Sequence, residues 1–181
     1  MRKESSCANT WAILEYAVHQ EGLDPRSLYA GLSAEIDRLA EPESYLRTPA
    51  NWVDAEFVAG MLARVRQQTG KELVAFDIGR FAVERALVNK RQRLALKLFG
   101  SHSKALVYAQ RLNDRWNRNK RIELIHLGQH SAIVRLHWHP IPTLTRDLCL
   151  HSQGVITHLP NFWDAEPLVL EEARCHFTGA P

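Results

Sequence analysis

The chain has 181 residues, of which 45% are hydrophobic and 24% are charged, values typical of one globular domain. It contains no apolar run of about 18 residues, which argues against a membrane span, and its three cysteines are too few for a disulfide scaffold. A net charge of +3 is low for a dedicated nucleic-acid binder, so direct contact with nucleic acid is not expected. Glu15 interrupts the apolar stretch near the N-terminus and no cleavage site follows, so we predict a cytoplasmic domain spanning residues 1–181.

The first part of the chain has the spacing of helices. Apolar residues recur at helical intervals over residues 10–21, and Gly22 stands where a C-cap is expected. Asp24 then precedes Pro25, the order of an N-cap and a first helical residue, which predicts a short second helix.

Two longer helices are expected after a connector. Residues 39–51 contain two prolines and predict an irregular segment. Asn51 is expected to cap a long helix that ends at Gly70. Another helix is expected over residues 72–86, where Gly79 would allow close packing against a neighbour.

The character of the sequence changes near residue 121. Before this point, Ser101 or Ser103 is expected to cap a helix that reaches Trp116. After it, polar and apolar residues alternate on both sides of a glycine turn, which predicts a β-hairpin over residues 121–139.

The last part of the chain predicts a helix and a strand. The helix begins at Thr145 and stops near Pro160, and the strand covers residues 167–175 and joins the sheet of the hairpin. The order of helices, hairpin, helix and strand predicts an α+β fold, in which an N-terminal helical part packs on a small antiparallel sheet.

Motifs of known enzymes are absent from the sequence. It has no dinucleotide-binding glycine motif, P-loop, zinc-protease motif or serine-hydrolase motif, and no evident pair of carboxylates, so we expect no catalytic activity. A basic run over residues 111–121 fits a solvated helix end or a phosphate-binding surface.

Two groups of residues have side chains that bind metals in other proteins. His137 and His139 share one face of a strand, where they either ligate a metal or form a polar face beside a turn. Cys149 lies on the expected last helix and could approach Glu172 and Cys175 on the expected last strand. These three residues are either zinc ligands or, for the thiols, ordinary buried core residues.

The segments DLCLHSQGVITHLP and LEEARCHFTGAP resemble the C-terminal half of the vinyl-4-reductase-type small-ligand-binding domain. That module occurs in phenol- and toluene-sensing regulators and is structurally related to heme NO-binding sensors. Residues 22–32 and 100–140 and the helix after Asn51 are similar to N-terminal sensor regions of bacterial signalling proteins, which precede histidine kinase, diguanylate cyclase or DNA-binding modules. The pattern is matched by Cys149, Gly154, Glu172, Cys175 and Gly179.

The resemblance implies a zinc site in relatives of this kind and a shortened chain here. The relatives would hold zinc through Cys149, Glu172, Cys175 and a further cysteine, which would fall just beyond Pro181. The chain is therefore expected to be a sensor domain truncated before its last strand, and without the fourth ligand a closed zinc site is not expected. The Tyr-x-Ser-x-Arg signature of heme NO sensors is absent, so heme is not expected either.

The function implied by the resemblance is that of a non-enzymatic regulatory sensor. It would bind a small, mostly apolar or aromatic ligand, form a homodimer and relay binding to an output module beyond residue 181. Alternatives are a heme-based gas sensor and the effector domain of a DNA-binding transcription regulator. Because ligand pockets are apolar with a few polar groups, the candidate ligand-binding residues are Phe99, His102, Trp116, His137, Trp138 and Phe162.

Overall fold

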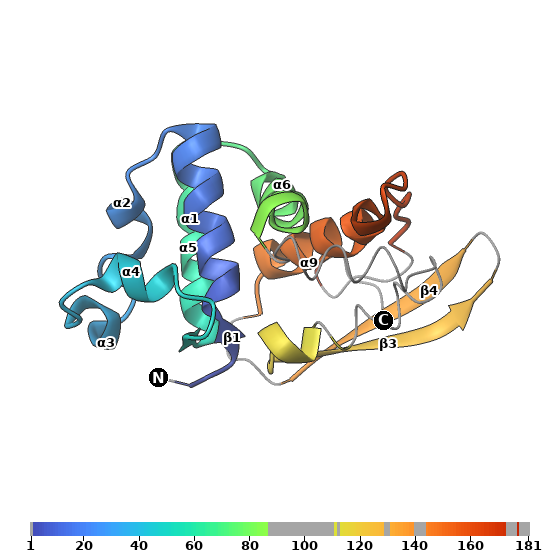
Figure 1. Ribbon diagram of the computed structural model, residues 1–181, viewed down its shortest axis with the longest axis horizontal. Helices are drawn as coiled ribbons and strands as arrows, with labels where there is room; N and C mark the ends of the chain where they lie inside the picture. Colours follow the sequence, from blue (N-terminus) through green and yellow to red (C-terminus); the bar gives the residue numbers. More distant parts are fainter. Residues whose placement is uncertain are drawn as a thin grey trace.

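The helices and the strands occupy different regions of the fold (Figure 1). The N-terminal helices lie at one side, a long hairpin extends at the other, and a crossed pair of helices lies between them. These elements, with two small antiparallel sheets, confirm the α+β class, and no helix in the described residues is long and apolar enough to cross a membrane. The computed structural model describes residues 2–86, 111, 113–128, 131–139, 144–172 and 177.

The first two helices are capped by the residues that the sequence predicts. Helix α1 (Cys7–Glu21) ends at Gly22, whose φ of 66° lies in the left-handed region that glycine adopts without strain. Helix α2 (Pro25–Tyr29) begins after Asp24, whose carboxylate accepts a hydrogen bond from the N–H of Arg26 (3.2 Å).

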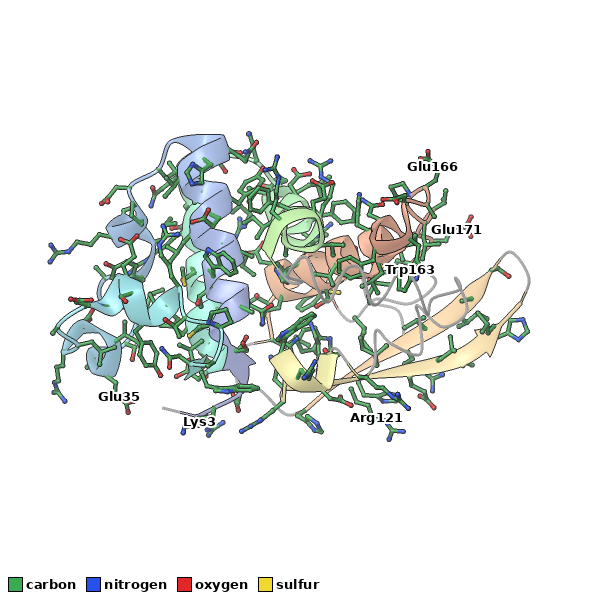
Figure 2. The ribbon with its side chains drawn as sticks, viewed as in Figure 1. Lys3, Glu35, Arg121, Trp163, Glu166 and Glu171 are labelled. Carbon is green, nitrogen blue, oxygen red and sulfur yellow. The ribbon has the colours of Figure 1, made fainter. Side chains whose placement is uncertain are left out.

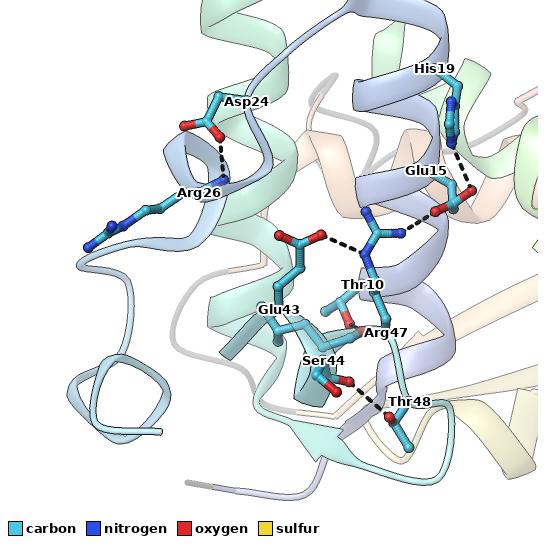
Figure 3. A network of polar contacts seen from close by, with 10 residues as sticks. Thr10, Glu15, His19, Asp24, Arg26, Glu43, Ser44, Arg47 and Thr48 are labelled. Carbon is cyan, nitrogen blue, oxygen red and sulfur yellow. Dashed lines mark hydrogen bonds and ion pairs between the residues drawn. The ribbon is translucent and has the colours of Figure 1, made fainter. Parts of the chain in front are cut away.

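The connector expected over residues 39–51 is partly helical. Two short helices follow α2, namely α3 (Ala34–Asp37) and α4 (Pro42–Leu46). Arg47, just after α4, forms ion pairs with Glu15 on α1 and with Glu43 on α4 (Figure 3). The prediction of an irregular connector was wrong here because Pro42 stands in the first turn of a helix, where proline is tolerated.

The long helix α5 (Ala55–Thr69) starts later than the sequence suggested. Its N-cap is Asp54, whose carboxylate accepts a 2.7 Å hydrogen bond from a backbone N–H in the first turn. Asn51 does not cap the helix, because the chain after it forms strand β2 (Trp52–Val53), which pairs with strand β1 (Ser5–Ser6). The prediction of Asn51 as the cap was therefore wrong by three residues.

Replacing Asp54 with alanine is expected to lower the free energy of unfolding by about 1 kcal/mol, because one N–H of the first turn loses its acceptor. Asp54→Asn should stay within a few tenths of a kcal/mol of the wild type, since asparagine caps helices about as well as aspartate. Urea unfolding followed by circular dichroism measures both. Equal losses in the two variants would show that Asp54 acts through its charge and not as a cap.

The crossed pair of helices is formed by segments far apart in the sequence. Its parts are α6 (Val74–Phe81), the π-helical turn η1 (Ala82–Ala86), α9 (Arg146–His158) and the 3-10 helix η2 (Leu159–Trp163). The hydroxyl of Thr145 accepts a hydrogen bond from the N–H of Leu148, which confirms the predicted start of the last helix. Arg66 on α5 pairs with Asp147 in the first turn of α9 (Nε–Oδ1 3.2 Å), which ties the pair to the N-terminal helices.

Two glycines bring α6 and α9 into backbone contact. A Cβ atom added to Gly79 would lie 2.2 Å from the carbonyl oxygen of His151, and one added to Gly154 would lie 2.1 Å from that of Phe76. The close packing predicted for Gly79 is confirmed. The crossing fixes the position of α9, and therefore of the side chains that α9 directs toward the hairpin.

The predicted hairpin is present, with strands β3 (Lys120–Leu127) and β4 (Ala132–Trp138) paired in antiparallel register. The register shifts between Leu124 and His126, which marks a bulge toward the tip. The face toward α9 carries two facing pairs near the base of the hairpin, Lys120 with Trp138 and Ile122 with Leu136.

The third strand expected over residues 167–175 is not formed in its described part. Residues 165–172 have no regular secondary structure. The N–H of Leu168 donates to the carbonyl of Thr157 (2.8 Å), so the described segment after η2 is attached to the end of α9. The prediction of a strand was wrong for these residues, because alternation of polar and apolar residues does not form a strand unless a neighbouring strand is available for backbone pairing.

Candidate functional site

A cavity of about 40 Å³ lies between the base of the hairpin and α9. Its volume is enough for a few water molecules or a small organic group. Its apolar walls are Trp116, Ile122, Leu136, Val155, Ile156 and Leu159. Its polar lining is formed by Asn9, Asn113, Asn117, Lys120, His151 and Ser152.

Lys120 directs its ammonium group toward α9. Its Nζ donates a 2.6 Å hydrogen bond to the hydroxyl of Ser152 and lies 5.0 Å from the ring centre of Trp138. Although the whole residue is only partly buried, its ammonium is desolvated, and this lowers the pKa of Lys120 to about 8. Lys120 thus lies on the face of β3 toward α9, and its charge is held between the hairpin and α9.

His151 is 5% exposed and contributes its ring to the same cavity. Within the described residues, its Nε2 has no hydrogen-bond partner. Burial, and next the positive charge of Lys120, lower the pKa of His151 to about 3, so its imidazole is neutral at ordinary pH. An unsatisfied buried nitrogen costs free energy unless water or a ligand supplies a partner.

Buried asparagines hold the base of the hairpin against the N-terminus. The amide of Asn113 donates to the backbone carbonyl of Lys120 (2.9 Å), and the amide of Asn9 on α1 donates to Asn117 (3.2 Å). Asn117 also forms an isolated β-bridge with Ser5. These contacts fix the backbone that carries Lys120 and connect it to the first turn of α1.

A second, open groove of about 310 Å³ lies outside the cavity. Asn117 and Lys120 belong to the lining of both spaces, so the groove adjoins the cavity at Lys120. The other groove residues are Asp114, Arg118, Arg121 and His139, which give it an excess of positive charge. Arg121 projects from the hairpin away from the helices (Figure 2).

Lys120 is the donor and Ser152 the acceptor in the hydrogen bond between them. Ser152 donates its hydroxyl hydrogen to the carbonyl of Leu148 (2.8 Å) and accepts from Lys120, so the lysine is a donor and not a base in this pair. A Ser–Lys nucleophile requires the opposite direction of proton transfer. The converging groups therefore supply hydrogen bonds and positive charge.

Of the described aromatic residues predicted to bind a ligand, one lines the cavity and two lie elsewhere. Trp116 lines the cavity, whereas Trp138 lies under the Lys120 ammonium and packs at the edge of the main core. Phe162 is fully buried in a smaller core cluster that Trp116 also contacts, and it does not line the cavity. Phe99 lies outside the described residues.

Of the two histidines predicted to bind a ligand, His137 is among the described residues and does not line the cavity. His137 lies on the outer face of the hairpin, where its Nε2 is 2.5 Å from a carboxylate oxygen of Glu123. This hydrogen bond is the main reason that the pKa of Glu123 is lowered. His102 lies outside the described residues.

Two of the three predicted metal ligands approach each other. The Sγ of Cys149 lies 3.9 Å from a carboxylate oxygen of Glu172, and Gln153 donates to the same oxygen (2.9 Å). This separation is near the roughly 3.5 Å expected between sulfur and oxygen ligands of one tetrahedral zinc ion. Cys175 lies outside the described residues, and the residues that are described include no group of three metal-binding side chains. The described donors therefore fit part of a zinc site but do not complete one.

The basic run over residues 111–121 contributes three cations to the outer groove, namely Arg118, Lys120 and Arg121. Two of them also have contacts elsewhere, because Arg118 stacks over the ring of Trp52 at 4.1 Å and Lys120 donates to Ser152 on α9.

Sequence reasoning missed Lys120, His151 and Ser152 as site residues. One usable sign was the alternation of KRIELIHL, which places Lys120 on the same face as Ile122, where an apolar residue is expected. His151 and Ser152 gave no comparable sign, because either could have been a solvent-facing position of a helix.

No family model matches the chain, and no curated protein or solved structure matches it either.

Proposed function

We propose that the chain is a non-enzymatic sensor domain that binds a small, mostly apolar ligand between the hairpin and α9 and relays binding to an output module. The observation that carries the proposal is the polar end of the cavity, where Lys120 and buried His151, whose Nε2 has no partner among the described residues, line one apolar-walled space. Small-molecule sites typically combine apolar walls with a few polar groups that orient the ligand.

The base of the hairpin offers a route for the relay. Besides the contact between Asn9 and Asn117, the N–H of Arg118 donates to the carbonyl of Glu4 (2.7 Å). A ligand that changes how β3 packs on α9 therefore acts on the segment that starts α1. A ligand shifts the equilibrium between two packings of β3 on α9 only if its affinities for the two packings differ. The cavity lies between β3 and α9, so the affinity of a ligand bound there depends on how they pack.

Native mass spectrometry of the purified chain, followed by denaturing mass spectrometry, tests this proposal. We expect an additional small mass in the native spectrum that is lost on denaturation, and the same spectrum tests the expected homodimer. Ile156→Phe fills the cavity and should abolish the additional mass, whereas Ile125→Phe, at a 45% exposed hairpin position, should retain it. An empty wild type that is also not stabilised thermally by any member of a panel of small acids, alcohols and phenols would contradict the proposal.

A further inference from the structure

The positive charge of Lys120 has no counter-ion among the described residues. Its ammonium is held by the Ser152 hydroxyl and by the face of Trp138, both of which are neutral. Among the described residues, the one acidic side chain that raises the pKa of Lys120 is Cys149, which carries a charge only as a thiolate. Desolvated cations in proteins are normally paired with an anion, because burial without one is costly.

A second donor converges on the same space. His151 is more than nine-tenths buried, and its Nε2 is without a partner in the described part of the chain. A neutral imidazole carries one N–H, and the tautomer with its hydrogen on Nε2 can donate to an anion bound beside Lys120. A water molecule alone could satisfy this nitrogen, but it would leave the charge of Lys120 uncompensated.

We propose that the ligand of this site is a small organic monocarboxylate, whose carboxylate accepts hydrogen bonds from Lys120 Nζ and His151 Nε2 and whose apolar part contacts Ile122 and Leu136. This inference rests on the proposed function and gives the chemical class of its ligand. The cavity volume of about 40 Å³ favours acids of a few carbon atoms, such as acetate, propionate and butyrate.

The outer groove provides an approach for such an anion. Arg118, Arg121 and His139 line it, and it shares Asn117 and Lys120 with the cavity. Positive charge along a groove raises the local concentration of anions and accelerates their association. The groove attracts anions in general, whereas the cavity selects an acid with a short apolar part.

Isothermal titration calorimetry in chloride-free buffer at constant ionic strength tests the inference. Propionate is compared with propionamide and 1-propanol, which have similar size and no charge. We expect measurable binding of propionate and at least about tenfold weaker binding of the two neutral compounds, because hydrogen bonds to charged groups contribute more than neutral ones.

Variants of the full chain identify the groups responsible. Lys120→Met should weaken propionate binding about tenfold or more, and His151→Gln should weaken it by a smaller factor because its amide can still donate. Arg121→Met removes a cation of the outer groove and tests whether the anion binds there. Arg135→Met is the matched control, since it removes an exposed hairpin cation that is not among the residues lining the cavity or the groove. It should change the dissociation constant less than about threefold at moderate ionic strength. Circular dichroism confirms that each variant is folded.

The possible outcomes separate this inference from the proposed function. If the neutral compounds bind as tightly as propionate and Lys120→Met has no effect on binding, the inference that the ligand is a carboxylate is overturned. The proposal that the cavity binds a small ligand is then still supported. If Arg121→Met loses as much affinity as Lys120→Met, the anion binds in the outer groove and the inference is overturned. If neither propionate nor the two neutral compounds bind, the inference is overturned, and the panel of acids, alcohols and phenols decides on the proposed function.

Discussion

Replacing Gly154 with alanine is expected to lower the free energy of unfolding by about 3 kcal/mol or more. The new methyl carbon would lie 2.1 Å from the carbonyl oxygen of Phe76 and 3.1 Å from the backbone nitrogen of Arg80. Both neighbours belong to the backbone of α6, so no side-chain rotation relieves the overlap. The two helices must separate, and overpacking of this kind is among the few mechanisms that produce large losses of stability.

Gly60→Ala on α5 is the matched control for this prediction. A Cβ atom at Gly60 would meet only the side chain of Leu32, at 3.0 Å, and that side chain can move. Alanine also favours a helix interior over glycine by about 1 kcal/mol, so Gly60→Ala should be close to neutral. Urea unfolding of both variants measures the difference. A Gly154→Ala protein within about 1 kcal/mol of the wild type would show that α6 and α9 are not in backbone contact.

Lys120→Met is expected to raise the free energy of unfolding by about 1–3 kcal/mol at pH 7, although it should weaken carboxylate binding about tenfold or more. The difference between the ordinary pKa of 10.5 and the folded-state pKa of about 8 corresponds to a penalty of about 3 kcal/mol on the charged lysine. Methionine keeps a flexible apolar side chain beside Trp138. Ser152 still donates to Leu148, so no buried hydroxyl is left unpaired.

The increase in the free energy of unfolding caused by Lys120→Met should become smaller as the pH rises from 8 to 10.5. Below pH 8 Lys120 is charged in both states and the full penalty applies, whereas between pH 8 and 10.5 the folded state alone has lost its proton and the wild type recovers stability. Besides Cys149 and His151 on α9, the charged and titratable residues that line the outer groove with Lys120 are Asp114, Arg118, Arg121 and His139. Urea unfolding of wild type and variant at pH 7 and pH 10 measures the change. A variant that is less stable than the wild type at pH 7, or an advantage that grows at pH 10, would contradict a desolvated charge at Lys120.

A stabilising substitution that removes binding is the behaviour expected of a functional residue. Buried charges kept at a cost in stability are common where a ligand must be recognised, and removing them often stabilises the fold. Gly154 has the opposite role, because its replacement should lower stability by disrupting the packing that positions α9.

The parts of the fold that depend on neighbouring residues could be predicted from the sequence. Gly22 and Asp24 cap their helices through contacts within one turn, and the hairpin follows from alternation around a turn. Asp54 was missed as a cap because the strand pairing of Trp52–Val53 with Ser5–Ser6 joins segments far apart in the chain. The strand expected near the C-terminus failed for the same reason, since the described segment binds α9 and not the hairpin edge.

The candidate site was less predictable than the fold. Trp116 was expected to contact a ligand because it is aromatic, and it does line the cavity. The approach of Cys149 to Glu172 also agrees with the expectation that the last helix and the segment after it lie together. Lys120 lies on β3 and His151 on α9, and only the packing of α9 against the hairpin brings them to one cavity. No local pattern in the sequence encodes that packing.

The pKa of Lys120, measured by NMR titration of its side-chain Cε–Hε signals with and without propionate, shows whether its buried ammonium binds a carboxylate. We expect a pKa near 8 for the free protein and a higher value when propionate is bound, because the bound carboxylate stabilises the ammonium form. A pKa near the ordinary value of 10.5 that propionate leaves unchanged would show that Lys120 is solvated and that the site does not bind carboxylates.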